Sequence, residues 1–122
     1  MNAEIRAQHL QNVTDAHAIE MYDGLCADYA RQYGAVSNAA QSIIADVAVM
    51  EQTKRELNND IEERGVMVTV YNGRQQFHQE NKAIQAARAL AEQQRKHLSE
   101  LKLTPASQRV NPDAAEDDFN SF

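Results

Sequence analysis

The chain has 122 residues, a formal net charge of −6, one cysteine, four glycines and no tryptophan. This length indicates one domain, and a single cysteine excludes an intrachain disulfide. Four scattered glycines exclude a glycine-rich phosphate-binding loop, and the longest apolar run is too short to span a membrane. The first 13 residues lack the apolar core of a signal peptide, so we expect a soluble protein from a reducing compartment.

Residues 1–13 are polar and are expected to form a flexible arm ahead of the first helix. Thr14 or Asp15 can cap that helix through a side-chain oxygen, and Gly34 ends it after about twenty residues. Cys26 is expected to be a small buried side chain rather than a reactive thiol. The predicted buried stripe is Ile19, Tyr22, Cys26, Tyr29 and Tyr33.

Ser37 can cap a second, long helix that runs to about Arg64 and stops at Gly65. Its stripe is predicted at Ala40, Ile43, Val47, Met50, Lys54, Leu57 and Ile61. Lys54 interrupts this stripe, and two interpretations remain open. The side chain can reach solvent along an apolar surface, or a single polar residue can fix the register or subunit number of a helical assembly.

The hydrophobic periodicity changes in the segment VMVTVYNGRQQFH, which is rich in β-branched and aromatic residues. Asn72-Gly73 favours the positive φ angles of a tight turn. The pattern predicts a β-hairpin with strands at 66–71 and 74–78, or an extended loop if the strands do not pair. Because an isolated two-stranded hairpin is marginal in water, we expect it to pack on helices or to pair with a neighbouring subunit.

A third helix is predicted over about 79–101, antiparallel to the second. Its stripe is Ile84, Ala87, Ala91, Gln94, Leu98 and Leu101. The helix is then expected to end and the chain to change direction, because Thr104 can cap a new helical turn and Pro105 suits its first position. Asn111-Pro112 then ends that short turn.

Charge is segregated along the chain. Residues 82–109 hold six basic and two acidic side chains, a balance of +4, whereas residues 110–122 hold four acidic side chains and no basic ones. The candidate DNA-contacting residues are Arg88, Arg95, Lys96, Lys102 and Arg109, and all but Lys96 recur every seven residues. Such a row is either a solvated helix face or, repeated around an oligomer, a belt that holds DNA phosphates without reading bases.

The acidic tail, residues 110–122, also has two interpretations. It is either a disordered, solubilising end or a peptide that docks on a basic partner. Two aromatic residues among acidic ones favour docking in a chain that is otherwise poor in aromatics. The candidate partner-binding residues are Asp117, Asp118, Phe119 and Phe122.

No residue pattern in the chain indicates catalysis. The four histidines and Cys26 do not show metal-ligand spacing, and the adjacent Glu62 and Glu63 point to different faces of a helix. We therefore expect no enzymatic activity, no metal and no cofactor. A small enzyme or a metal protein is the interpretation that these features disfavour most.

Three motifs, in their order and spacing, resemble a family of short phage terminase small subunits. They are MYDGLCADYARQY, IEERGVMVTVYNG and LKLTPASQR, and the resemblance covers roughly residues 15–110. The matching residues are Gly65, Val66, Val68, Thr69, Asn72, Gly73, Leu103, Thr104, Pro105, Ser107 and Arg109.

The resemblance implies a non-enzymatic part of the viral DNA-packaging motor, working in the cytoplasm of the host bacterium. Such subunits recognise viral double-stranded DNA and recruit and regulate the large subunit, which carries the ATPase and nuclease. Many assemble as rings. Many of them carry an N-terminal helix-turn-helix domain for DNA, whereas only a 13-residue arm precedes the first predicted helix of this sequence. DNA contact is therefore expected from the ring surface, from the basic third helix or from Arg6, or else through another packaging protein.

The predicted fold is all-α, a long antiparallel helical hairpin with a preceding helix and a small β-hairpin insertion at 66–78. A ring-like homo-oligomer is its expected assembly. The predicted organisation is a flexible arm at 1–13, a helical oligomerisation domain at 14–109 and an acidic tail at 110–122. The alternative function is a helical, oligomeric structural or adaptor protein that binds no nucleic acid.

Overall fold

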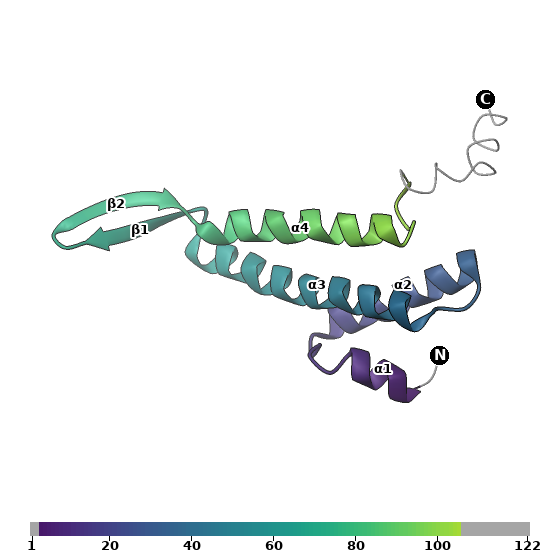
Figure 1. Cartoon of the computed structure of the whole chain (residues 1–122). Helices are drawn as coiled ribbons and strands as arrows, with labels where there is room; N and C mark the ends of the chain where they lie inside the picture. Colours follow the sequence, from purple (N-terminus) through teal and green to yellow (C-terminus); the bar gives the residue numbers. More distant parts are fainter. Residues whose placement is uncertain (1–2, 106–122) are drawn as a thin grey trace, which may run out of the picture.

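The computed structural model describes residues 3–105 of the chain. Its helices are α1 (Ala3–His9), α2 (Ala16–Tyr33), α3 (Asn38–Arg64) and α4 (Lys82–Glu100), and its strands are β1 (Met67–Asn72) and β2 (Gln75–Glu80). α3 and α4 lie side by side and antiparallel, and the β-hairpin connects them (Figure 1). The predicted helical hairpin, preceding helix and small β-hairpin are confirmed, whereas the ring stays a prediction.

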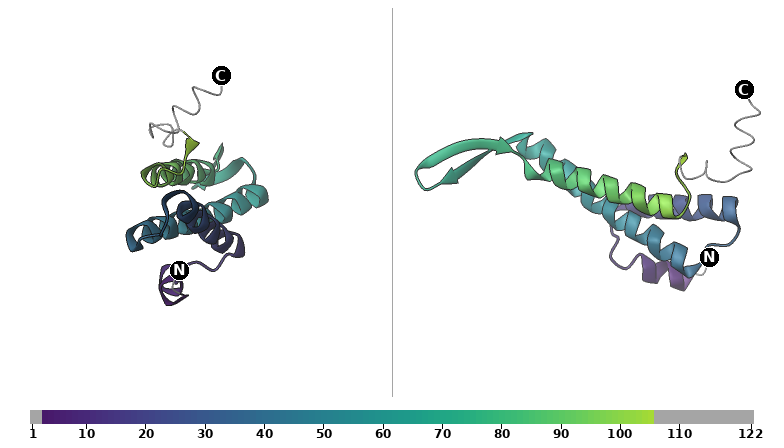
Figure 2. Two further views of the ribbon diagram at one scale, coloured as in Figure 1. Left: turned by 90° about the vertical axis from the view of Figure 1, so that its right-hand side faces the viewer. Right: turned by 45° about the horizontal axis from the view of Figure 1, so that its top comes forward.

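α3 is the central element of the fold. α4 lies along one side of it, α2 packs against its N-terminal half on another side, and α1 also contacts it (Figure 1, Figure 2). The two views of Figure 2 show α4 and α1 on opposite sides, with α2 and α3 between them. The molecule is therefore thick at one end and only two helices wide at the other.

Polar side chains start the three long helices. Asp15, Ser37 and Asn81 each accept a hydrogen bond from a backbone N–H in the first turn, at 3.0, 3.1 and 3.0 Å. Asp15 rather than Thr14 therefore caps α2. Gly34 and Gly65 end α2 and α3 with φ angles of 91° and 85°, as the sequence predicts.

α1 forms where the sequence predicts a flexible arm. Arg6 donates hydrogen bonds through Nε and Nη2 to the two carboxylate oxygens of Asp23 on α2, at 2.9 and 2.8 Å. Beyond the helix, Leu10 packs against the core and Val13 is buried in it. A helix of seven residues is too short to leave a clear periodic signal, so this contact could not be predicted from the pattern.

The core lies where α2, the N-terminal half of α3 and the end of α4 meet. Its buried residues are Val13, Ala18, Tyr22, Cys26, Ala40, Ile44, Ala45, Ala48 and Leu101. The predicted stripe of α2 is confirmed at Tyr22 and Cys26, and Ile19 and Tyr29 pack at the margin of the core. Tyr33, by contrast, is 42% exposed, at the last residue of α2.

The buried side of α3 is wider than a single stripe. Ile44 and Ala48 are buried, whereas Ile43 and Met50, which the stripe predicted to face the core, are only half-buried. Other helices contact the N-terminal half of α3 from more than one side, so a broad arc of it is covered. In the C-terminal half of α3 the covering element is α4 (Figure 1), and no α3 residue after Glu51 is buried.

The β-hairpin pairs in a continuous antiparallel register, from Met67 opposite Glu80 to Asn72 opposite Gln75. Gly73, with a φ of 64°, and Arg74 form the turn, one residue later than the predicted Asn72-Gly73 turn. The two strands extend beyond the ends of α3 and α4 instead of lying along them (Figure 1). Packing on the helices is therefore not how the hairpin completes its burial.

α4 starts later and stops earlier than predicted. β2 continues to Glu80, so the helix begins at Lys82 rather than near residue 79. At the other end Lys102 has a φ of 57°, and the N–H of Leu103 donates to the carbonyl of Leu98 at 2.9 Å. This is a Schellman-type helix end. The described residues stop at the Thr104-Pro105 corner, so the turn predicted after it lies outside them.

Candidate nucleic-acid interface

α4 presents its basic residues on the side that does not face α3. Ala83, Gln94 and Leu101 are buried toward α3, and they lie on one line along the helix. At about 100° per residue, Arg88 and Arg95 share a flank roughly a third of a turn from that buried line. Both are exposed, so the pair forms one cationic flank of the helix, as the heptad spacing predicts.

Lys96 and Lys102 do not continue this flank. Lys96 lies about 100° further round the helix from Arg95, on its outer face. Lys102 comes after the last helical residue and has left-handed backbone geometry, so the seven-residue row ends with the helix. Both side chains are exposed. Arg109 lies outside the described residues.

Few of the basic side chains of α4 pair with an acidic side chain. Arg95 makes an exposed contact of 3.5 Å with Glu92, and such surface pairs contribute little. Within residues 3–105, Arg88 and Lys96 make no ion pair. Positive charge on the outside of α4 therefore remains available to an anion such as a phosphate.

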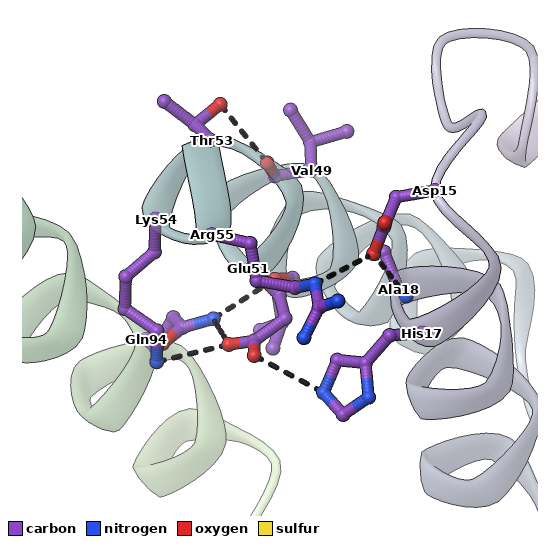
Figure 3. Close-up of polar contacts among 10 residues, drawn as sticks. Asp15, His17, Ala18, Val49, Glu51, Thr53, Lys54, Arg55 and Gln94 are labelled. Carbon is purple, nitrogen blue, oxygen red and sulfur yellow. Dashed lines mark hydrogen bonds and ion pairs between the residues drawn. The ribbon is translucent and has the colours of Figure 1, made fainter. Parts of the chain in front are cut away.

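A buried polar junction fixes the position of α4 on α3 (Figure 3). The side-chain amide of Gln94 donates to the backbone carbonyl of Val47 at 3.2 Å and to Glu51 Oε1 at 3.1 Å. Its oxygen accepts a hydrogen bond from Lys54 Nζ at 2.8 Å, and the same ammonium group contacts Glu51 Oε1 at 2.9 Å. Lys54 is therefore bonded within its own chain instead of reaching freely into solvent, and its effect on subunit number stays a prediction.

The junction also reaches α2. His17 Nε2 lies 3.3 Å from Glu51 Oε2, and Arg55 Nε lies 3.1 Å from Asp15 Oδ2 (Figure 3). Burial raises the pKa of Glu51, but the hydrogen bonds from Lys54 and Gln94 outweigh it, so the net shift is downward. Glu51 is therefore a buried carboxylate whose charge is held by partners from α3 and α4.

A second junction holds the start of α4 and the base of the hairpin. Asn81 is fully buried and, besides capping α4, donates to Asp60 Oδ2 at 3.2 Å and to the carbonyl of Gly65 at 3.1 Å. Its own N–H donates to the carbonyl of Val66 at 2.7 Å. Hydrogen bonds from Arg64 and Asn81 lower the pKa of Asp60. The side chain of Asn81 thus connects the end of α3 with α4, and its backbone N–H holds the residue that precedes β1.

Sequence reasoning missed Glu51 and Asn81 and did not pair Lys54 with Gln94. The sequence held a signal for that pair. Lys54 and Gln94 each interrupt the apolar stripe of a helix, and the two helices were predicted to pack antiparallel, so the two polar side chains could have been expected to meet. Asn81 was overlooked because the helix was predicted to begin ahead of it, although asparagine is a strong N-cap residue.

The described residues contain no cluster of candidate metal ligands. Within residues 3–105, no group of three or more metal-binding side chains gathers. Cys26 is buried, as predicted, and burial raises the pKa of its thiol. Burial also raises the pKa of Tyr22 to about 12. None of the helices in this part of the chain combines the length and apolarity needed to cross a bilayer.

The candidate partner-binding residues are not placed. Asp117, Asp118, Phe119 and Phe122 all lie outside the described residues. The chain leaves the described part close to Tyr33, whose hydroxyl donates to the carbonyl of Lys102 at 2.6 Å. Contact of this tail with a partner therefore remains a prediction.

The sequence was also compared with known proteins. A family model described as phage terminase, small subunit, matches residues 18–118. The range begins two residues inside α2 and includes α3, the β-hairpin and α4. No curated protein and no solved structure matches the chain.

Proposed function

Because the chain belongs to the family of phage terminase small subunits, we propose that it is the non-catalytic subunit of a viral DNA-packaging motor. In this role it binds viral double-stranded DNA and recruits and regulates the large ATPase–nuclease subunit, in the cytoplasm of the host bacterium. The observation that carries the proposal is the family match, which includes α3, α4, the hairpin and nearly all of α2.

The exposed cations of α4 supply the DNA contact. Arg88 and Arg95 share a flank, Lys96 lies on the outer face, and Lys102 follows the helix end. Arg109, beyond the described residues, adds to the same charge. Side chains of this kind bind phosphate oxygens and position a protein on DNA without reading its sequence. One subunit supplies few such contacts, so binding depends on several copies acting together.

A homo-oligomeric ring supplies those copies. The core is concentrated at one end of the molecule, and the outer halves of α3 and α4 cover each other on one side only. Helices with half-buried stripes gain by packing against a neighbour. A ring of identical subunits repeats the cationic flank at a constant spacing and so creates a belt that DNA phosphates can occupy.

Neutralising the cationic residues tests the DNA contact. We expect Arg88→Gln, Arg95→Gln and Lys102→Gln together to weaken binding of a viral DNA fragment at least about tenfold at low salt. The slope of log affinity against log salt should fall by about 0.9 for each phosphate that the variant no longer neutralises. Fluorescence anisotropy over a salt series measures both quantities.

The control changes the same charge elsewhere. Arg31→Gln, Arg55→Gln and Arg74→Gln remove three exposed cations from α2, α3 and the hairpin turn, and circular dichroism first checks that loss of the Arg55–Asp15 ion pair leaves this variant folded. This variant should keep the wild-type salt slope. Equally weakened binding in both triple variants would show an effect of net charge alone, and no DNA retention by the wild type at low salt would favour the adaptor alternative.

Recruitment of the large subunit is assigned to the acidic tail. We expect Phe119→Ala with Phe122→Ala to abolish capture of the large subunit and its ATPase stimulation, while DNA binding stays unchanged. Asp117→Asn with Asp118→Asn should weaken capture in a salt-dependent way, since it removes charge alone. Full capture by a chain truncated after residue 110 would contradict the assignment.

A further inference from the structure

Most of the exposed large apolar side chains among residues 3–105 lie in or next to the β-hairpin. Tyr71 is 72% exposed, Met67 is 56% exposed and Phe77 is 43% exposed. Val66 and Tyr33 complete the exposed large apolar residues of residues 3–105, so four of the five lie in or next to the hairpin. By the register Met67 and Tyr71 lie on one face of the hairpin and Phe77 on the other, so both faces expose apolar side chains, and exposed apolar surface of this kind marks a contact site.

Both edges of the hairpin offer unpaired backbone groups. In an antiparallel pair, opposite residues alternate between hydrogen-bonded pairs and non-hydrogen-bonded pairs. The N–H of Asn81 donates to the carbonyl of Val66, so this pair is a hydrogen-bonded one, and the register determines which later pairs are not. The backbone groups of Met67, Thr69 and Tyr71 on β1 therefore point away from β2. Those of Gln76, His78 and Glu80 on β2 point away from β1. Among the described residues no third strand meets either edge.

The hairpin lacks the features that keep free edges apart. Proteins protect exposed edges with lysine, proline, bulges or inward-pointing charges. Residues 66–80 contain no lysine and no proline, and the register shows no bulge. Their two charged residues are Arg74, in the turn, and Glu80, at the base. Unprotected edges of this kind are typical of strands that are covered in the functional assembly.

A second copy of the chain fits these edges best. The whole chain carries a net charge of −6, so copies repel one another, but the hairpin itself is neutral and meets its equivalent without that penalty. A single arginine at the tip supplies too little charge for a DNA-binding element. The two outer edges also match in length, since each strand has six residues.

We infer that β1 of one subunit pairs edge to edge with β2 of the next, so that the projecting hairpins form a continuous antiparallel sheet between neighbouring subunits. The inference rests on the proposed homo-oligomer. In a ring all hairpins point in the same direction along the ring axis, so β1 of one subunit runs antiparallel to β2 of the next at every junction. The contact is heterologous, closes with the ring and leaves no free edge.

Cysteine cross-linking between two differently tagged chains tests this contact. In a Cys26→Ala background, one chain carries Thr69→Cys on the outer edge of β1. The other carries Gln76→Cys or His78→Cys on the outer edge of β2, which covers two registers. The chains are mixed in denaturant, refolded together and oxidised mildly. We expect a mixed disulfide dimer, well above the yield from Thr69→Cys mixed with Gln85→Cys on the exposed side of α4.

Native mass, measured by light scattering on the same samples, separates this inference from the proposed function. A ring-sized mass without the mixed disulfide would overturn the hairpin contact and leave the terminase role standing. Disulfides only between identical chains would replace the heterologous contact by a two-fold one and also overturn it. A monomeric mass without cross-links would contradict the proposed assembly itself. Disulfide formation between the hairpin cysteines and an added DNA duplex that carries a thiol tether, instead of with the second chain, would make the hairpin a DNA-contacting element and overturn the inference.

Discussion

Individual side chains decide where the elements of this protein begin and how they join. Asn81 is the clearest case, because one amide caps α4, binds Asp60 and holds the carbonyl of Gly65. Two of these bonds lie at the C-terminal end of α3 and the third lies at the start of α4. Removing the side chain therefore loosens the junction of α3 and α4 from which the hairpin projects.

We expect Asn81→Ala to lower the free energy of unfolding by about 2 kcal/mol, since it removes a helix cap and leaves buried polar groups without a partner. Urea denaturation followed by circular dichroism measures the change. Gln85→Ala on the exposed side of α4 is the matched control and should change stability by less than about 0.5 kcal/mol. A destabilisation by Asn81→Ala no larger than that of the control would show that the junction adds no stability.

Lys102 presents the opposite case, a residue whose backbone geometry suits another amino acid. Its φ of 57° lies in the left-handed region that glycine adopts without steric cost. We expect Lys102→Gly to raise stability by about 1 kcal/mol. Because it also removes a proposed DNA contact, the same variant should bind DNA more weakly. Lys102→Gln, which keeps the strain, should weaken DNA binding without the gain in melting temperature.

At the scale of elements, the polar junction between α3 and α4 sets the alignment of the two helices. Lys54 bonds to Gln94 and Glu51 of its own chain, so this ammonium group already has a structural role within one subunit. We expect Lys54→Leu to destabilise the fold by about 2 kcal/mol while the native mass stays unchanged. A double-mutant cycle with Gln94→Leu should show coupling between the two sites. A change in mass would restore the assembly role predicted from the sequence.

Acid should weaken this junction. The pKa of Glu51 is lower in the folded chain than in the unfolded one, so its contribution to stability is present above the unfolded pKa. That contribution disappears as pH falls below about 4.3 and through the folded pKa. We expect Glu51→Gln to be less stable than wild type at pH 7 and to lose less stability on acidification. Glu62→Gln, on an exposed part of α3, should follow the wild-type profile.

Much of the element order was predictable from local chemistry. Ser37, Gly34 and Gly65 mark helix ends because caps and left-handed positions depend on a residue and its near neighbours. The turn at Gly73-Arg74 was missed by one residue, since Asn72-Gly73 and Gly73-Arg74 both place glycine where a positive φ is needed. The burial of Ile44 instead of Ile43 could not be predicted, because it depends on how many helices surround α3.

The candidate site was predictable in part for the same reason. Exposure of Arg88 and Arg95 follows from helical periodicity, and the structure agrees. Lys102 left the row because a helix end, not a spacing, determines its position. The contacts of Gln94 with Val47 and Glu51 join residues more than 40 positions apart, which no local pattern encodes.

At the scale of the whole molecule, stability should depend on how many copies are present. A subunit whose core is confined to one end gains stability when a neighbour covers the rest, and that gain follows mass action. We expect the melting temperature to rise with protein concentration over the micromolar range. Differential scanning calorimetry at several concentrations measures this. A melting temperature independent of concentration would indicate that the fold does not depend on assembly.

The uneven thickness of the molecule has a consequence for its local motions. The core covers the backbone amides of α2 and of the first half of α3. Few other residues cover the amides of the last turns of α3, the start of α4 and the hairpin. Amide hydrogens should therefore exchange with solvent in a graded order, fastest at the hairpin tip and slowest around Tyr22 and Ile44. Joining of neighbouring subunits would appear as slowed exchange at the fast end alone.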